Sequence, residues 1–196
     1  MVRVLAPLFL TAPVLGAALR AVLRPAALGS CVGLNAALLA GLPSQQEALA
    51  LAFPGAQIAR REHFLTEAQG KAVQEKAGVP LPGLWQVAYE ARKEGRIVGV
   101  AFFDTHRVRT LNETAMVAVG ADGRILRVEV VAFREPEEYR AKEAWVRQLE
   151  GHRLDPELSL KRGIRPLAGA TLTAHALTDA SRRGLALFQV LYGEGR

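Results

Sequence analysis

Residues 168–191 read AGATLTAHALTDASRRGLALFQVL and join a turn of small residues to a long amphipathic pattern. Apolar residues recur every three or four positions, which predicts a helix from Leu172 to Leu191 that is about 30 Å long. The predicted packed face holds Leu172, Ala176, Ala180, Leu187, Phe188 and Leu191, and the predicted solvent face holds Asp179, Arg182 and Arg183. Gly193 and Gly195 supply the stop. Such a helix must bury one whole face against another layer, and this requirement directs the fold.

The start of this helix is suited to holding an anion. Gly169 and Ala170 leave the backbone uncovered, and the free N–H groups of a first helical turn carry the positive end of the helix dipole. The hydroxyls of Thr171 and Thr173 occur in the same turn. The sequence therefore predicts a phosphate site without a lysine, or alternatively a simple threonine N-cap. Gly184 inside the helix costs about 1 kcal/mol against alanine, which indicates close packing there.

Four elements are predicted between residues 64 and 149. They are a helix (64–77), a hairpin (84–103), a second hairpin (114–119 with 125–131) and a helix opened by Pro136 (136–149). The hairpin turns are marked by Glu94-Gly95 and by Ala121-Asp122-Gly123. Together with the C-terminal helix, this order predicts one α+β domain: a twisted antiparallel sheet of hairpins with helices packed against it.

Residues 168–191 resemble the C-terminal segment of FMN-binding domains related to the C subunit of sodium-pumping NADH:quinone oxidoreductase and the G subunit of Rnf electron transport complexes. The motif of that family runs aspartate, two variable residues, serine or threonine, glycine, alanine, then threonine or serine. Its last hydroxyl carries FMN through a phosphoester bond made by a separate flavin transferase. Gly169, Ala170 and Thr171 match the motif. The resemblance implies that Thr171 carries the flavin and that an FMN-binding domain covers residues 47–196.

Two positions depart from the family motif. Arg165 stands where aspartate is expected, and Ala168 stands where serine or threonine is expected. An arginine reverses the charge that the transferase meets, yet it can also sit beside a phosphate and help to hold FMN without a covalent bond. Covalent and non-covalent FMN therefore both stay open, with Thr173 as a second phosphate donor.

The first 46 residues are predicted to be a signal peptide or a membrane anchor. Residues 4–19 and 26–42 are uncharged and largely apolar, and Arg20 and Arg24 separate them. Each stretch is a little shorter than the roughly 20 residues that span a bilayer. A third interpretation is that the start of the protein is assigned too far upstream and that the true export signal begins near Val22. A fourth is that the two stretches form a buried pair of helices. The first three place the domain in the periplasm or on the extracytoplasmic face of the cell membrane.

Cys31 is the only cysteine, so the chain has no internal disulfide and no dithiol pair. Its setting, Leu28-Gly29-Ser30-Cys31, resembles a bacterial lipobox, in which the cysteine is lipidated after cleavage. The residues just before it are not the unbroken apolar run of such a signal, because Arg20, Arg24 and Pro25 interrupt it. A lipid anchor and an incidental small residue are both compatible with the sequence.

The formal net charge is +6, and Arg3, Arg20 and Arg24 contribute three of these charges. Lys161 and Arg162 precede the small-residue turn and can raise the local potential for an anionic cofactor. Aromatic residues do not alternate with them, as a single-strand-binding surface would require. Nucleic acid is therefore not an expected partner.

No catalytic constellation is recognisable in the sequence. His63, His106, His152 and His175 lack metal-ligand spacing, and neither a serine elbow nor a P-loop is found. His175 lies one turn from Thr171 and is a candidate neighbour of the cofactor. Three further groups fit either a site or a structural role. They are Glu135, Glu137 and Glu138 (paired carboxylates or a solvated helix start), Tyr139 and Trp145 (flavin pocket or helix packing), and Arg107 and Arg109 (phosphate contact or solvated edge).

The resemblance implies an extracytoplasmic FMN flavoprotein that carries electrons. Its partners would be redox proteins or a membrane electron-transport complex, with the flavin transferase as a possible further partner and the membrane contacted through the N-terminal segment. Such a domain is an electron carrier rather than a stand-alone enzyme. Two alternatives are a flavin-free extracytoplasmic binding or scaffold module that has kept the fold, and an FMN-using reductase with its own small substrate.

Overall fold

The structure is a computed structural model that describes residues 41–193. The predictions for residues 1–40, which include Cys31 and all of the two apolar stretches except Gly41 and Leu42, lie outside the described residues, and so does Gly195. The first helix, α1 (Gln45–Ala52), begins two residues before Glu47, and a capping box between Ser44 and Glu47 stabilises its N-terminus. Within the described part of the chain, no helix is both long enough and apolar enough to cross a bilayer.

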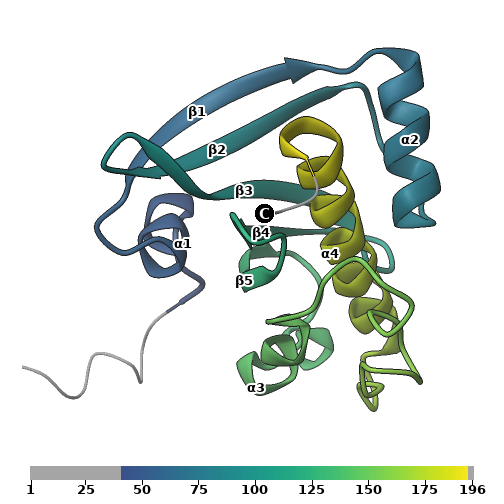
Figure 1. The fold of residues 1–196 in the computed structure, drawn as a ribbon. Helices are drawn as coiled ribbons and strands as arrows, with labels where there is room; N and C mark the ends of the chain where they lie inside the picture. Colours follow the sequence, from purple (N-terminus) through teal and green to yellow (C-terminus); the bar gives the residue numbers. More distant parts are fainter. Residues whose placement is uncertain (1–40, 194–196) are drawn as a thin grey trace, which may run out of the picture. The chain divides into compact units, whose positions relative to one another are not determined.

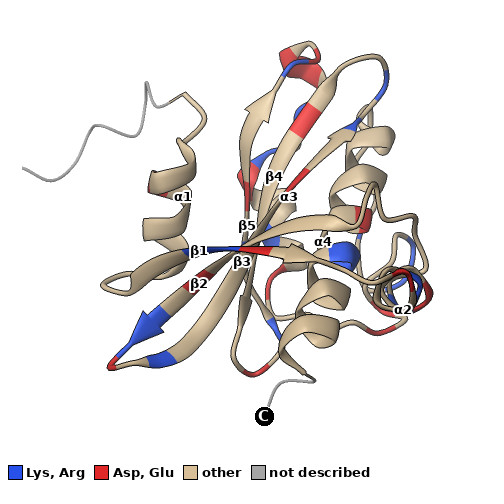
Figure 2. Ribbon diagram, turned by 90° about the horizontal axis from the view of Figure 1, so that it is seen from above, with Lys and Arg blue, Asp and Glu red and all other residues tan. Residues whose placement is uncertain are grey.

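The centre of the fold is a five-stranded antiparallel sheet in which sequence neighbours lie side by side (Figure 1). The strands are β1 (Gln57–Phe64), β2 (Trp85–Lys93), β3 (Arg96–Arg107), β4 (Asn112–Gly120) and β5 (Ile125–Phe133). Figure 2 shows the strands fanning out with a marked twist. The α+β prediction, with its twisted antiparallel sheet and long C-terminal helix, is confirmed.

Both predicted hairpins are present. Glu94 and Gly95 turn β2 into β3 with φ values of 50° and 76°, which is the left-handed region that such tight turns need. Gly123 has a φ of 76° in the turn between β4 and β5, where the Gly120 N–H donates to the carbonyl of Arg124. A third hairpin joins β3 to β4 through residues 108–111, with Arg107 paired to Asn112.

The predicted helix at residues 64–77 begins too early. Phe64 is the last residue of β1, and the helix α2 covers Glu67–Ala77, with Thr66 as its N-cap and Gly78 as its left-handed end. The strand was missed because β1 is an edge strand with polar residues on both faces, so its sequence lacks the alternation of a half-buried strand.

The continuous helix predicted from Pro136 to Leu149 is wrong. Three short helical turns replace it: η2 (Glu137–Tyr139), α3 (Glu143–Val146) and η3 (Arg147–Leu149). The backbone is extended at Arg140 and Lys142, with ψ values of 133° and 149°. Burial of Ala141 and Trp145 against the main core fixes this irregular path, which helix propensity alone does not predict.

The helices cover the two faces of the sheet unequally, as Figure 2 shows. The long helix α4 (Thr171–Tyr192) and α2 pack on one face, and α1 packs on the other. The main core lies beneath α4, where Leu177 and Leu185 meet Val100 and Val117 of the sheet. A smaller core around Leu49, Phe53 and Met116 lies beneath α1. The rigid sheet therefore supports the N-terminal end of α4.

The helix α4 has the predicted length, but its faces were partly misassigned. Leu172, predicted to be packed, is 51% exposed. Arg183, predicted to be solvated, is buried and forms an ion pair with Asp104 of β3 at 2.6 Å. Arg182 is half-buried and donates to the carbonyls of Ala77, Asp155 and Leu158. These partners come from distant segments, so the helical spacing alone could not identify them.

Gly184 lies where α4 packs closely against Val117 of β4, as the sequence indicated. A Cβ added at Gly184 would lie 2.8 Å from Cγ1 and 3.0 Å from Cβ of Val117. We expect Gly184→Ala to destabilise the protein by about 1–2 kcal/mol in denaturant unfolding, because overpacking against the stiff Val117 outweighs the better helix propensity of alanine. Adding Val117→Ala should recover part of this loss. An alanine at position 184 that stabilises the protein would contradict the packing.

Candidate functional site

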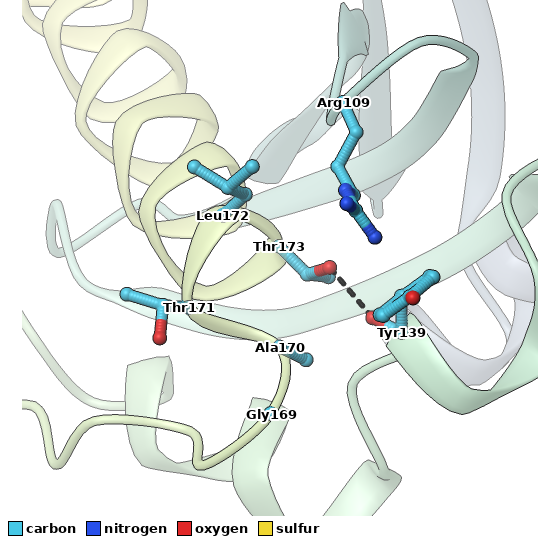
Figure 3. Close-up of a pocket in the computed structure, with 7 residues that line it drawn as sticks. All are labelled: Arg109, Tyr139, Gly169, Ala170, Thr171, Leu172 and Thr173. Carbon is cyan, nitrogen blue, oxygen red and sulfur yellow. Dashed lines mark hydrogen bonds between the residues drawn. The ribbon is translucent and has the colours of Figure 1, made fainter.

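A pocket of about 290 Å³ lies at the N-terminal end of α4 (Figure 3). It is lined by the segment Gly169–Thr173 together with Arg109 and Tyr139. Arg109 belongs to the loop between β3 and β4, and Tyr139 ends η2. Three segments far apart in the sequence therefore meet at the turn that the sequence had singled out.

The first turn of α4 presents backbone donors to this pocket. Ala170 occupies the N-cap position and has no side chain that could cap the helix. The first amide with an intrahelical acceptor is that of Ala174, which donates to the carbonyl of Ala170. The N–H groups of residues 171–173 thus have no acceptor among the described residues, and they carry the positive end of the dipole. Gly169, at φ 78°, leaves open space beside them.

A cation and an aromatic ring complete the pocket. The guanidinium of Arg109 lies 4.5 Å from the centre of the Tyr139 ring, in a cation–π contact. The loop that carries Arg109 is held by the buried Glu135 carboxylate, whose Oε1 accepts from the N–H groups of Arg109 (3.0 Å), Thr110 (2.6 Å) and Leu111 (2.8 Å). These hydrogen bonds lower the pKa of Glu135, and the one from the Leu111 amide contributes most. The helix-start role predicted for Glu135 is therefore wrong, because its carboxylate closes this loop instead.

The two threonines of the turn have different surroundings. Thr173 is buried, and its hydroxyl donates to the carbonyl of Tyr139 at 2.6 Å. This hydrogen bond connects α4 to η2. The Thr173 hydroxyl proton is therefore already donated and is not available to a phosphate. Thr171 is exposed, and its hydroxyl has no hydrogen bond within the described chain; in Figure 3 it points away from Tyr139. Neither threonine is the N-cap, so the simple capping alternative is also wrong.

The remaining predicted site residues lie outside the pocket lining. Ala168 is exposed and directly precedes Gly169, the first residue of the segment that lines the pocket. Arg165 is held elsewhere: its backbone N–H and its Nε both donate to Oε1 of Gln148 at 3.2 Å, and its carbonyl accepts from Nε1 of Trp145. Trp145 therefore has the packing role. His175 is exposed on α4 and does not line the pocket.

A second polar cluster lies between β3, β4 and α4, and sequence reasoning missed it. His106 bridges two carboxylates, with Nδ1 at 2.8 Å from Asp104 and Nε2 at 3.0 Å from Glu113. Arg183 binds both oxygens of Asp104, at 2.6 and 2.8 Å. The signal was present in the sequence, because Asp104 and His106 share one face of a strand directly after the apolar run 97–103.

Burial and charge act against each other in this cluster. Burial alone would raise the pKa of Asp104, but hydrogen bonds from Arg183 and His106 outweigh it and lower the pKa to about 2. Burial alone would lower the pKa of His106, but Asp104 and Glu113 raise it to about 9. Burial raises the pKa of Glu113.

These values predict a loss of stability in alkali. The pKa of His106 rises on folding, so its contribution is complete below its ordinary pKa of 6.5 and is lost as the pH passes 9. We expect the free energy of unfolding to fall by up to roughly 3 kcal/mol across this range, at about 1.36 kcal/mol per pKa unit. Urea unfolding at a series of pH values would measure it. His106→Gln should flatten the profile, whereas the exposed His175→Gln should not; an unchanged profile in His106→Gln would refute the assignment.

No protein-family model matches the chain, and no curated protein is significantly similar to it. The likeness to FMN-binding domains thus stays a prediction from the motif residues near Thr171. The pocket brings the motif residues Gly169, Ala170 and Thr171 together with Arg109 and Tyr139, which are not part of that motif.

Proposed function

We propose that this chain is an FMN-binding domain that carries electrons between redox partners on the extracytoplasmic side of a membrane. The observation that carries the proposal is the pocket at the start of α4, where free backbone amides and Arg109 meet beside Thr171. FMN, when bound, supplies the capacity to accept and release electrons one or two at a time.

The donor set fits the phosphate end of a mononucleotide. The amides of residues 171–173 and the Arg109 guanidinium are the groups that bind phosphates at helix N-termini. The volume of about 290 Å³ is close to the lower end of ordinary ligand pockets, roughly 300–1,000 Å³. It suits a part of FMN, with the remainder lying outside this pocket. Tyr139 provides an apolar wall.

Thr171 is the residue that would carry FMN covalently. Its hydroxyl is accessible and free of competing hydrogen bonds among the described residues, unlike that of Thr173. Attachment forms a bond from Oγ1 to phosphorus, releases the hydroxyl proton and breaks the bond from phosphorus to a leaving group. A transferase must therefore supply the flavin as an activated nucleotide. Arg165 and Ala168 do not line the pocket, so their departure from the family motif affects recognition by the transferase more directly than phosphate binding.

Co-expression with a flavin transferase tests this proposal. The purified full chain should be yellow and should bleach and recover on chemical reduction and reoxidation, and acid precipitation should separate bound from attached flavin. A folded protein that stays colourless with the transferase and after incubation with free FMN would overturn the proposal and favour the flavin-free module. The mass of the mature protein from its native membrane or periplasm would report N-terminal cleavage, any lipid and any attached FMN.

Arg109 should matter more than its neighbour Arg107. We expect Arg109→Gln to weaken non-covalent FMN binding roughly 10- to 100-fold, because a charge-assisted hydrogen bond to phosphate is worth about 1.5–3 kcal/mol. Quenching of flavin fluorescence measures the affinity. Arg107→Gln is the matched control, since Arg107 is exposed two residues away and does not line the pocket. Equal weakening by both variants would indicate a general charge effect and contradict the assigned role.

A further inference from the structure

The side chain of Glu135 links the segments that form the pocket. Glu135 lies between β5 and η2, and η2 ends at Tyr139. Its carboxylate reaches the loop between β3 and β4 and accepts hydrogen bonds from three successive backbone amides, the first of which belongs to Arg109. The Tyr139 carbonyl in turn accepts from the hydroxyl of Thr173 in the first turn of α4. The loop, η2 and the start of α4 are therefore joined, and Glu135 makes the contact to the loop.

The loop at residues 109–111 holds this carboxylate as an anion-binding loop holds its ligand. Oε1 of Glu135 lies between 2.6 and 3.0 Å from all three amide nitrogens, and the Thr110 hydroxyl lies 3.5 Å from each carboxylate oxygen. Successive amides that converge on one point form a concavity that favours a full negative charge. The pairing of β3 with β4 ends before this loop, so the sheet offers these amides no acceptor. The side chain of Glu135 supplies one.

The Glu135 carboxyl is charged at neutral pH, and its charge is directed at the backbone. The hydrogen bonds from the loop amides, above all that from Leu111, hold its pKa below the ordinary value for a glutamate. The attraction to the Arg109 guanidinium is the smallest of these effects on the pKa. Glu135 thus fixes the backbone of Arg109 and leaves most of the guanidinium charge to the pocket.

The side chain of Arg109 depends on this loop for its position. It is exposed, and within residues 41–193 its guanidinium forms no hydrogen bond and no ion pair. Its contact with the Tyr139 ring, 4.5 Å from the ring centre, is a cation–π interaction, which is weak at an exposed site. Figure 3 shows the guanidinium pointing toward this ring. So weak a contact keeps the guanidinium at the pocket only where the backbone that carries it is fixed.

We propose that Glu135 is a positioning residue of the pocket: its carboxylate takes the place of a free anion in the loop and so holds the Arg109 guanidinium beside Tyr139. Glu135 does not line the pocket, so its effect on a ligand passes through the loop. The geometry of the loop is independent of the identity of that ligand, whereas an effect on FMN binding rests on the proposed function.

Nuclear magnetic resonance of the flavin-free full chain tests the position of Arg109. The Tyr139 ring current should shift the Arg109 side-chain protons in the wild type, and Glu135→Ala should remove this shift. Sodium acetate should restore it, because the added carboxylate can occupy the vacated loop. Glu138→Ala, at an exposed carboxylate three residues later, is the control and reports any direct effect of acetate on the pocket. Arg109 signals that are unchanged in Glu135→Ala, or a loss that acetate does not reverse, would overturn the proposal.

Glu135→Gln keeps the test decisive if the alanine variant does not fold. Glutamine has the same reach and keeps one oxygen for the amides but lacks the charge, so part of the Arg109 shift should remain. The three loop amides should exchange with solvent deuterium roughly tenfold faster than in the wild type, because hydrogen bonds to a charged acceptor are the stronger ones. Exchange at the wild-type rate would contradict the role of the carboxylate.

The affinity for FMN shows whether Glu135 acts through Arg109. Glu135→Ala should raise the dissociation constant by no more than the roughly 10- to 100-fold expected of Arg109→Gln. In the Arg109→Gln background it should have less than about a twofold further effect, because residues that act as a unit are not additive. An equal factor in both backgrounds would overturn the proposal. A wild type that binds no FMN would count against the proposed function alone, because the resonance experiment still decides the role of Glu135.

Discussion

Thr171→Ala is expected to abolish covalent attachment of FMN while leaving the fold intact. Thr171 is the first residue of α4, its side chain is exposed, and its hydroxyl makes no hydrogen bond within the described chain. Alanine is also the better helix former, so stability should change by less than about 0.5 kcal/mol. Mass spectrometry of protein co-expressed with a flavin transferase would show the loss of the FMN adduct.

The controls for this variant are Thr171→Ser and Thr173→Ser. Serine at position 171 keeps an accessible hydroxyl, so attachment should persist. Serine at position 173 keeps the hydrogen bond to the Tyr139 carbonyl and should leave both the adduct and the fold unchanged. An FMN adduct that remains on Thr171→Ala would show that another hydroxyl carries the flavin and would refute the assignment of Thr171.

Asp104→Asn is expected to destabilise the protein by about 3–5 kcal/mol. The change leaves two buried cations, Arg183 and His106, without the carboxylate that both contact. Removing one partner of a buried ion pair typically has this cost, because the remaining charge loses its compensation. A shift of the denaturation midpoint at constant slope would measure the loss.

An exposed ion pair provides the matched control. Lys71 and Glu75 are 3.7 Å apart on the surface of α2, and both side chains are more than half exposed. Glu75→Gln should change the free energy of unfolding by no more than about 0.5 kcal/mol. If Asp104→Asn has an equally small effect, the cluster does not hold α4 to the sheet in the way described here.

The pairing of β2 with β3 and that of β4 with β5 followed from strong local signals. Glu94-Gly95 and Ala121-Asp122-Gly123 are turn sequences between alternating strands, and short connections make sequence neighbours antiparallel. The edge strand β1 was missed because residues such as Arg60, Arg61 and Glu62 carry no alternation. The segment after Pro136 was misjudged because burial of Trp145 overrides local helix propensity.

The candidate site was predicted only in part for a related reason. Its turn at Gly169–Thr173 is contiguous in the sequence, so it could be recognised directly. Arg109 and Tyr139 reach the same pocket only through the register of the sheet and the fold of η2. Likewise, Arg183 looks solvated on a helical projection, because nothing near it in the sequence shows that Asp104 lies opposite.

Titration of the folded, flavin-free chain with FMN and, in parallel, with riboflavin tests the central claim most directly. The two ligands share the same ring and side chain, and only FMN has the phosphate that the amides of α4 and Arg109 are proposed to hold. The account predicts saturable quenching of FMN fluorescence and binding of riboflavin that is weaker by at least roughly tenfold. Equal affinity for both ligands, or no binding of FMN, would contradict it.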